Sequence, residues 1–359
     1  MGLRPPLLDI RAWRTDPERF ARSLRHACHR IGFFQLRHDL PPAVPASMLQ
    51  CARDFFALPA ADKGSICYSR SPAFRGYMGQ GVENTAGAAD LREQVELAPD
   101  EPPAPPRALP PYERLRGPNQ WPGAMPALRP TVEGYVERMA GLCDELSDAL
   151  CLALRLPQGA LRSVLYPAPH WQLKLARYSP VARSSAGGGA GAWDEAGAPL
   201  GVGAHTDSGF LTLVLQDGGG GLQAWSRGGW VDVPAGGPDI LVCNLGEVAQ
   251  LVSGGYLLAT PHRVLRPPAA RYSVPFFYNP RLGAEILPLQ LPEELPWERE
   301  VEFERGGRLC WERPQNVMHG CFGANAFKSL ARSHPSVFSA HHPDLRLCQI
   351  GGGVATVCF

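Results

Sequence analysis

The feature that most constrains the fold is the stretch Gly203-Ala204-His205-Thr206-Asp207-Ser208-Gly209. In a β-strand, residues i and i+2 point to the same face, so His205 and Asp207 can direct an imidazole and a carboxylate at one point. A third candidate ligand, His262, enters another apolar, β-favouring run far downstream. A chain that uses these three side chains together must bring distant strands into one β core.

Two imidazoles and one carboxylate can occupy one face of an Fe(II) octahedron and leave three positions open for substrates and O₂. Nine positions after His262 come Arg271 and then Ser273, again an i, i+2 pair. An arginine beside a hydroxyl suits a carboxylate that is held by a fork of charge-assisted hydrogen bonds. The order of these residues therefore predicts an open metal site next to an anion anchor.

The surrounding sequence is rich in strand patterns. Residues 210–217 read as a buried strand, 221–225 and 230–234 as a hairpin, 239–247 as a further strand, and 171–178 as an alternating barrel strand. The same His-x-Asp pattern at His342-Pro343-Asp344 has no histidine downstream at a comparable distance, and proline suits a central strand poorly. We interpret that second pair as a structural turn.

The ordered set of His-x-Asp, a later His and then Arg-x-Ser resembles the 2-oxoglutarate/Fe(II)-dependent dioxygenases, specifically the isopenicillin N synthase-like family. The resemblance implies a mainly β fold with flanking helices, in which a double-stranded β-helix (jelly-roll) forms the core. It places a helix-rich N-terminal region of the non-haem dioxygenase type at residues 1–165. The jelly-roll core follows at 166–285, and a C-terminal extension that packs on it at 286–359.

On this resemblance, His205, Asp207 and His262 are the metal ligands and the catalytic centre. Arg271 and Ser273 bind the far carboxylate of a 2-oxo acid. The implied cofactors are Fe(II), 2-oxoglutarate as co-substrate and O₂, with ascorbate as a stimulant. Because an unpaired buried charge is expensive, the permanent charge of the arginine is the expected partner of that carboxylate.

Four further residues are candidates for ligand contacts. Relatives often place a tyrosine hydroxyl against the co-substrate carboxylate, and Tyr178 is our choice, although Ser179 stands where many plant members have that tyrosine. Arg75 and Glu83 lie in a glycine-rich loop whose counterpart approaches the barrel mouth in relatives; the alternative is a surface loop held by an aromatic residue. Lys174 faces either the pocket or solvent.

The resemblance implies oxidative decarboxylation of 2-oxoglutarate to succinate and CO₂, coupled to hydroxylation of a small molecule, with desaturation or cyclisation as other outcomes. One alternative is an isopenicillin N synthase-like or aminocyclopropane-carboxylate oxidase-like oxidase that does not use 2-oxoglutarate. Another is ethylene-forming-type chemistry, suggested by residues 81–87, although Ser208 stands where that group carries a tyrosine. A non-catalytic jelly-roll binding protein is the alternative from a different class.

Helices are predicted over residues 17–32, 46–56, 130–156 and 325–333, with a short strand at 33–36. Residues 181–200 are low in complexity and precede the His205 strand. Such a segment cannot bury enough apolar surface to order itself, so we interpret it as an insertion at the rim of the site.

Composition excludes some classes of partner. Lys and Arg together number 35 against 34 for Asp and Glu, which argues against bulk binding to nucleic acid or to an anionic membrane. No apolar run reaches the ~18 residues of a membrane span. Ten scattered cysteines and the absence of a secretory peptide predict reduced thiols and a cytoplasmic protein. We expect a small-molecule substrate and a monomer or weak homo-oligomer.

Overall fold

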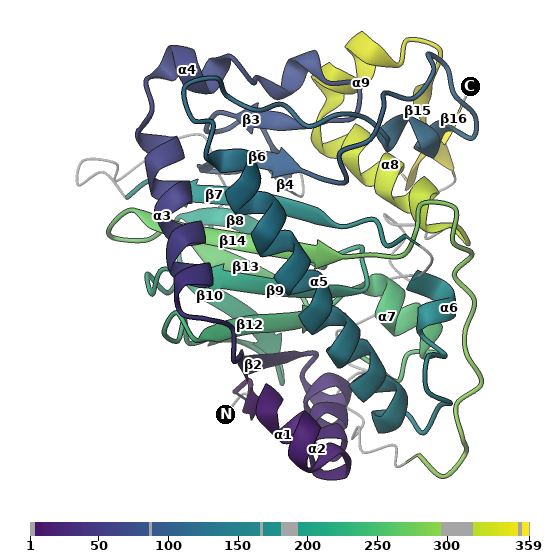
Figure 1. The fold of residues 1–359 in the computed structure, drawn as a ribbon. Coiled ribbons are helices and arrows are strands. Elements are labelled where there is room, and N and C mark those ends of the chain that lie inside the picture. The colour runs from purple at the N-terminus through teal and green to yellow at the C-terminus, as the bar shows by residue number, and fades with distance from the viewer. Residues whose placement is uncertain are drawn as a thin grey trace.

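The computed structural model describes residues 4–85, 88–165, 168–180, 193–295, 319–350 and 354–358. Two β-sheets form its centre, as Figure 1 shows. Within the described residues the larger sheet has eight strands, in the order β1 (Leu7–Asp9), β2 (Phe33–Arg37), β12 (Ile240–Leu245), β9 (Leu211–Gln216), β14 (Arg271–Tyr278), β7 (Gln172–Tyr178), β6 (Arg92–Leu97) and β3 (Gly76–Met78). The smaller sheet has the order β11 (Gly229–Asp232), β10 (Leu222–Ser226), β13 (His262–Leu265) and β8 (Leu200–His205).

A compact apolar cluster fills the space between the two sheets. It joins side chains of β2, β7 and β12 in the larger sheet to side chains of β8, β10 and β13 in the smaller one. Opposed antiparallel sheets that share an interior are the architecture of a jelly-roll. The predicted mainly β jelly-roll core with flanking helices is therefore confirmed. Cluster members include Phe33, Tyr178, Val202, Leu222, Val242 and Val264.

Helices cover the outer face of the larger sheet, where α3 (Ala43–Ala57) and α5 (Leu128–Ala153) cross it (Figure 1). The buried side of α5 carries the stripe that the sequence predicted, because apolar residues recur at helical spacing. Helix α2 (Pro17–Arg30) begins as expected, with Pro17 in its first turn and the Asp16 carboxylate accepting a hydrogen bond from the Arg19 N–H. The stripe on α5 comprises Val132, Tyr135, Met139, Leu142, Leu146 and Leu150.

The N-terminal region contributes more strand than the sequence suggested. Beside β2, it supplies β1, β3 and β6 to the larger sheet, and the glycine-rich loop contains β3 and the short β4 (Asn84–Thr85). Glycine is needed in β3 because Gly76 has φ +121°, and a Cβ there would lie 2.3 Å from the Ile66 carbonyl oxygen. The domain boundaries at 165 and 285 stay a prediction.

Short elements complete the chain. After β14 in the chain, α8 (Phe322–Ser333), α9 (Pro335–His341) and the hairpin β15 (Arg346–Ile350) and β16 (Val354–Cys358) lie together near β3 (Figure 1). Residues 181–192, most of the predicted insertion, lie outside the described residues. None of the helices in the described part of the chain combines the length and apolar character needed to cross a membrane. The remaining short elements are α1 (Ile10–Thr15), α4 (Ala60–Gly64), α6 (Arg162–Leu165), α7 (Glu247–Val252) and β5 (Ala88–Ala89).

Candidate functional site

Two strands of the smaller sheet bring the predicted metal ligands together. His205 ends β8 and His262 begins β13, and the two are direct partners in the antiparallel ladder. Their ring centroids lie 4.3 Å apart. The Asp207 Oδ1 atom lies 3.8 Å from His205 Nε2 and 3.6 Å from His262 Nε2. One atom from each side chain therefore faces a common point.

Neighbouring groups fix which atoms face that point. The Nδ1 atoms of His205 and His262 lie 2.8 Å and 3.1 Å from the carbonyl oxygens of Gly203 and Thr260. A carbonyl can only accept, so each Nδ1 carries the proton and each Nε2 keeps a free lone pair. This arrangement orients the imidazoles as metal ligands are commonly oriented.

The carboxylate is held in the same way. Asp207 Oδ2 accepts hydrogen bonds from Thr212 Oγ1 at 2.6 Å and from Asn244 Nδ2 at 2.7 Å. Oδ1 is left for the metal. Thr212 and Asn244 are partners across the β9–β12 ladder, so the larger sheet aims a carboxylate that follows β8 of the smaller sheet.

The protonation states of His205 and Asp207 favour metal binding at this cluster. Burial lowers the pKa of His205 to about 4, and the nearby His262 acts in the same direction. Burial alone would raise the pKa of Asp207, but His262, His205 and the two hydrogen bonds to Oδ2 lower it below its usual value. A neutral His205 imidazole and an ionised Asp207 carboxylate therefore face the same point as His262 Nε2. Their ligand atoms all lie within 4.8 Å of one another, and this donor set fits Fe(II).

A second group of potential ligands, formed by Glu83, Glu96 and His334, already holds a cation of its own. Lys174 Nζ lies 3.0 Å from Glu83 Oε1 and 2.5 Å from Glu96 Oε1. An ammonium between two carboxylates supplies the charge that a metal would bring. We therefore assign no metal to this group.

The predicted anion anchor lies in the same pocket. Arg271 is 1% exposed, yet its partners are neutral: Nη2 donates to Gln216 Oε1 at 2.6 Å, and Nη1 lies 3.4 Å from Ser273 Oγ. Its Cζ lies 4.7 Å from the ring centroid of Tyr178, and its Nε has no hydrogen-bond partner among the described residues. A buried guanidinium whose partners are neutral and whose Nε–H is unused suits an acidic ligand in this pocket.

Apolar side chains enclose the space between the ligands and the anchor. The pocket is lined by the three ligands, by Arg271, Ser273 and Tyr178, and by Arg92. Its wall is otherwise mainly apolar, and the edge of Phe33 packs against the His262 ring with centroids 5.3 Å apart. A dry wall strengthens every electrostatic interaction inside it. The apolar lining comprises Phe33, Val202, Val214, Leu222, Val264, Pro275 and Phe277.

The three candidate substrate contacts lie elsewhere than expected. Arg75 does not line the pocket: its guanidinium donates to the carbonyl oxygens of Pro99, Gly117 and Leu115. It holds its own loop in place, since buried carbonyls need donors. Lys174 does not line the pocket, and it lies largely buried between Glu83 and Glu96, with its side chain 15% exposed. Glu83 does not line the pocket either and pairs with Arg92 and Lys174.

Four polar residues of the site were not predicted: Thr212, Gln216, Asn244 and Arg92. The first three interrupt apolar strand runs, and a buried polar group needs a partner. A polar residue inside an apolar strand run could therefore have identified these three positions from the sequence. Arg92 is different because residues 91–97 alternate, and such a pattern does not reveal which face of the strand looks into the barrel.

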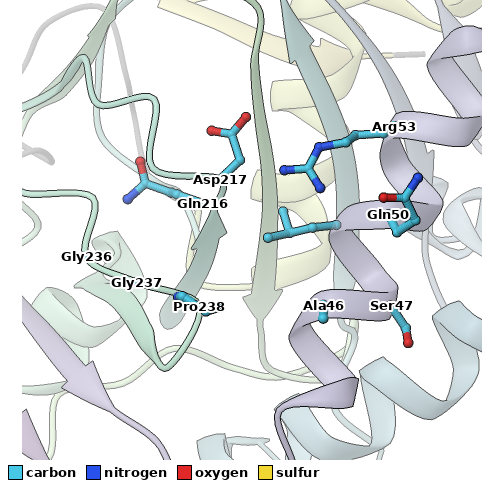
Figure 2. Close-up of a pocket in the computed structure, with 10 residues that line it drawn as sticks. Ala46, Ser47, Gln50, Arg53, Gln216, Asp217, Gly236, Gly237 and Pro238 are labelled. Atoms are coloured by element: carbon cyan, nitrogen blue, oxygen red, sulfur yellow. The ribbon is translucent and has the colours of Figure 1, made fainter.

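A larger hollow, of about 620 Å³, lies outside the metal site, between α3 and the ends of β9 and β12 (Figure 2). Its polar side chains have local roles. Gln50 donates to Asp54, Arg53 lies over the Tyr272 ring, and Asp217 accepts from backbone N–H groups. No set of unpaired groups converges there among the described residues, so we do not assign chemistry to it.

Known proteins resemble both parts of the chain. Residues 5–124 match the family described as non-haem dioxygenase in morphine synthesis N-terminal, and residues 172–280 match the 2OG-Fe(II) oxygenase superfamily. The 2-oxoglutarate-dependent dioxygenase frbJ of Dothideomycetidae sp. (strain 11243) is 31% identical over 346 residues, which cover 92% of this chain and 90% of that protein.

Two further comparisons extend the picture. A homoarginine-6-hydroxylase of Arabidopsis thaliana is 28% identical over 276 residues, covering 76% of this chain and 72% of that protein. A full-length Neurospora crassa protein, crystallised in complex with alpha-KG and thymine, has a TM-score of 0.68 at 24% identity. It covers 86% of this chain and 93% of its own, and at that identity the likeness is one of fold.

Proposed function

The chain belongs to the 2-oxoglutarate- and Fe(II)-dependent oxygenase superfamily, and from that premise we propose that it hydroxylates a C–H bond of a small organic molecule bound beside His205. As an enzyme it couples this oxidation to the decarboxylation of 2-oxoglutarate. Its iron ligands are His205, Asp207 and His262. We further propose that it acts in the cytoplasm, in keeping with its unpaired cysteines in the described residues, and that it is a monomer or a weak homo-oligomer.

One observation carries the proposal: the metal ligands and a buried, incompletely paired guanidinium share a single pocket. The ligands alone would suit several metal proteins. The addition of Arg271, whose partners are neutral, calls for a carboxylate ligand next to the metal. That combination suits a 2-oxo acid, because such an acid can chelate a metal at one end and reach an arginine with the other.

The residues divide the work between them. Arg271 and Ser273 bind the far carboxylate of 2-oxoglutarate, and Tyr178 packs against the guanidinium and limits its movement. Gln216 orients the other edge of that guanidinium. Thr212 and Asn244 keep Asp207 Oδ1 pointed at the metal. When bound, the iron supplies the O₂ chemistry, and the apolar wall keeps water from the oxidant.

The isopenicillin N synthase-like alternative would use Arg271 and Ser273 for a different carboxylate. The relatives at 31% and 28% identity carry names of 2-oxoglutarate-dependent enzymes or of a hydroxylase, which favours the leading proposal. Ethylene-forming chemistry rests only on the similarity of residues 81–87, and Ser208 stands where that group carries a tyrosine. A non-catalytic jelly-roll binding protein would not account for the convergence of His205, Asp207 and His262 on one point.

The direct test is succinate formation measured together with O₂ uptake in the Fe(II)-loaded protein. We expect succinate to form from 2-oxoglutarate and to increase when a substrate is added. The matched variant is His262→Ala, which removes one ligand from the start of β13. O₂ uptake with a proven substrate but without succinate would reject the proposal in favour of the oxidase alternative.

A further inference from the structure

We propose that Arg92 is a substrate-binding residue that holds an anionic group, typically a carboxylate, of the molecule to be oxidised. The inference rests on the proposed function and adds the chemical class of the substrate. Arg92 belongs to the N-terminal region rather than to the jelly-roll strands that carry the metal ligands. On this proposal the N-terminal region contributes to substrate recognition, while the jelly-roll core carries the metal ligands.

The position of Arg92 follows from the register of three neighbouring strands. Arg92 of β6 is paired with Tyr178 of β7, and Tyr178 is paired in turn with Arg271 of β14. A row across the sheet thus places one tyrosine between two guanidiniums. All three side chains line the metal pocket. The co-substrate requires only one of these guanidiniums, so the pocket contains a second one with no assigned ligand.

The hydrogen bonds of Arg92 leave donors available. Its Nη2 lies 2.5 Å from Glu83 Oε2 and 3.3 Å from Asp90 Oδ2. Its Nη1 reaches the Tyr178 hydroxyl at 3.4 Å, a long contact, and its buried Nε has no partner among the described residues. Arg271 shows the same free Nε. Each guanidinium therefore has a donor left for an incoming acceptor.

Three carboxylates stand behind the two cations Arg92 and Lys174. Glu83 is shared between Arg92 and Lys174, and Lys174 also binds Glu96. Asp90 is the remaining carboxylate: burial, and secondarily Glu83, raise its pKa to about 6, although Arg92 opposes the rise. Protonation of Asp90 would leave Glu83 and Glu96 as the only carboxylates of this group, with Glu83 shared between Arg92 and Lys174. An arriving anion can then replace the charge that Asp90 loses and accept from the N–H that Arg92 keeps without a partner among the described residues.

The same arrangement disfavours cationic substrates. Glu83 could receive a substrate guanidinium or ammonium only by giving up Arg92 or Lys174, each of which would then be buried with less of its countercharge. The charged residues that line the pocket are Arg92, Asp207 and Arg271. Iron engages Asp207 and 2-oxoglutarate engages Arg271, which leaves a positive group to meet the substrate.

The test compares carboxylic acids with their own primary amides. We would add phenylacetate, cinnamate, indole-3-acetate and longer aryl and alkyl acids, each with its amide, and also agmatine, a cation without a carboxylate, to the Fe(II)- and 2-oxoglutarate-loaded protein. Succinate formation above the substrate-free rate should rise with acids and not with amides or cations. Stimulation confined to amides or cations, or absent from the whole panel, would overturn the inference.

Variants separate binding from structural support. Loss of a charge-assisted hydrogen bond should raise the KM for the best acid about ten- to a hundredfold in Arg92→Met, with the weak binding of its amide unchanged. Asp90→Asn should lower the KM for the acid, since it removes a competing negative charge. Anaerobic titration calorimetry of the loaded protein with the acid should show the same order of affinities. The matched control is Arg177→Met, because Arg177 pairs with Glu93 and does not line the pocket.

If Arg92 has only a structural role, Arg92→Met should change the KM for the acid and the KM for its amide equally. Asp90→Asn should then not lower the KM for the acid. That pattern would reject the inference and leave the oxygenase proposal intact. Failure of the wild-type protein to bind 2-oxoglutarate at all would instead reject the proposed function. The two failures are therefore distinguishable in one set of samples.

Discussion

His205 and His262 are direct cross-strand partners, and the β8–β13 ladder becomes irregular immediately beyond them. The regular pairing holds the two imidazoles side by side, and the irregular register shifts the strands after the ligands are placed. Such shifts are common beside active sites, where they redirect side chains. The metal site is therefore built on a rigid pair of strands, while its fine orientation depends on the larger sheet.

That dependence gives the first prediction. Asn244→Leu removes the amide that donates to Asp207 Oδ2, while the apolar strand around it can accept leucine. We expect Fe(II) affinity to fall about ten- to a hundredfold, as is usual when a group that orients a ligand is lost. Fluorescence-monitored Fe(II) titration would measure it. Unchanged affinity would mean that Thr212 alone orients the carboxylate, which Thr212→Val would then reveal.

The second prediction concerns the co-substrate anchor. Gln216→Leu removes the amide oxygen that accepts from Arg271 Nη2. The freed guanidinium loses its fixed direction, so the KM for 2-oxoglutarate should rise about five- to tenfold, equivalent to about 1 kcal/mol. The value of kcat should change little, because Gln216 touches no reacting atom. A fall in kcat at saturating 2-oxoglutarate would contradict this role.

A third prediction follows from Asp90. Burial, joined by Glu83, raises its pKa to about 6, so between about pH 4 and pH 6 the folded protein binds a proton that the unfolded chain has released. Stability should therefore fall as pH rises through that window. In Asp90→Asn this loss should be absent, and the variant should gain about 2–3 kcal/mol relative to wild type between pH 4 and pH 7. Urea unfolding at several pH values would measure the difference; a constant difference would contradict the assignment.

The fourth prediction tests the glycine-rich loop. Gly76→Ala places a methyl 2.3 Å from the Ile66 carbonyl oxygen at a φ of +121°. We expect a loss of roughly 2–4 kcal/mol in the free energy of unfolding, since both strain and a clash act at one position. Gly79→Ala is the matched control three residues away, because a Cβ there meets nothing within 4 Å. Equal effects of the two substitutions would show that the loop moves freely.

Much of the fold and the metal site could be predicted because these depend on local patterns. The His-x-Asp spacing indicated that His205 and Asp207 meet, although β8 ends at His205 and Asp207 lies just beyond it. The stripe on α5 follows from helical periodicity. The resemblance to a known family placed His262 and Arg271 beside them. The jelly-roll core was confirmed for the same reason: its strands have distinct apolar runs.

The rest depends on pairings between distant segments. Whether Lys174 looks into the pocket, toward solvent or between two glutamates is set by the register of β6 against β7, which no local pattern fixes. Arg75 carries the same charge as Arg92, yet it serves backbone carbonyls while Arg92 lines the pocket. Residue type and loop position did not distinguish these two arginines, because only the folded sheet decides which of them faces the barrel.

The most direct test of the whole account is an anaerobic titration of the Fe(II)-loaded protein with 2-oxoglutarate. The account predicts a metal-to-ligand charge-transfer band that grows to saturation in the wild-type protein. In Arg271→Ala the band should be missing at the same concentrations and return only at much higher ones, while Fe(II) binding is retained. A wild-type protein that binds Fe(II) but develops no band, or an Arg271→Ala protein that titrates like wild type, would contradict the account.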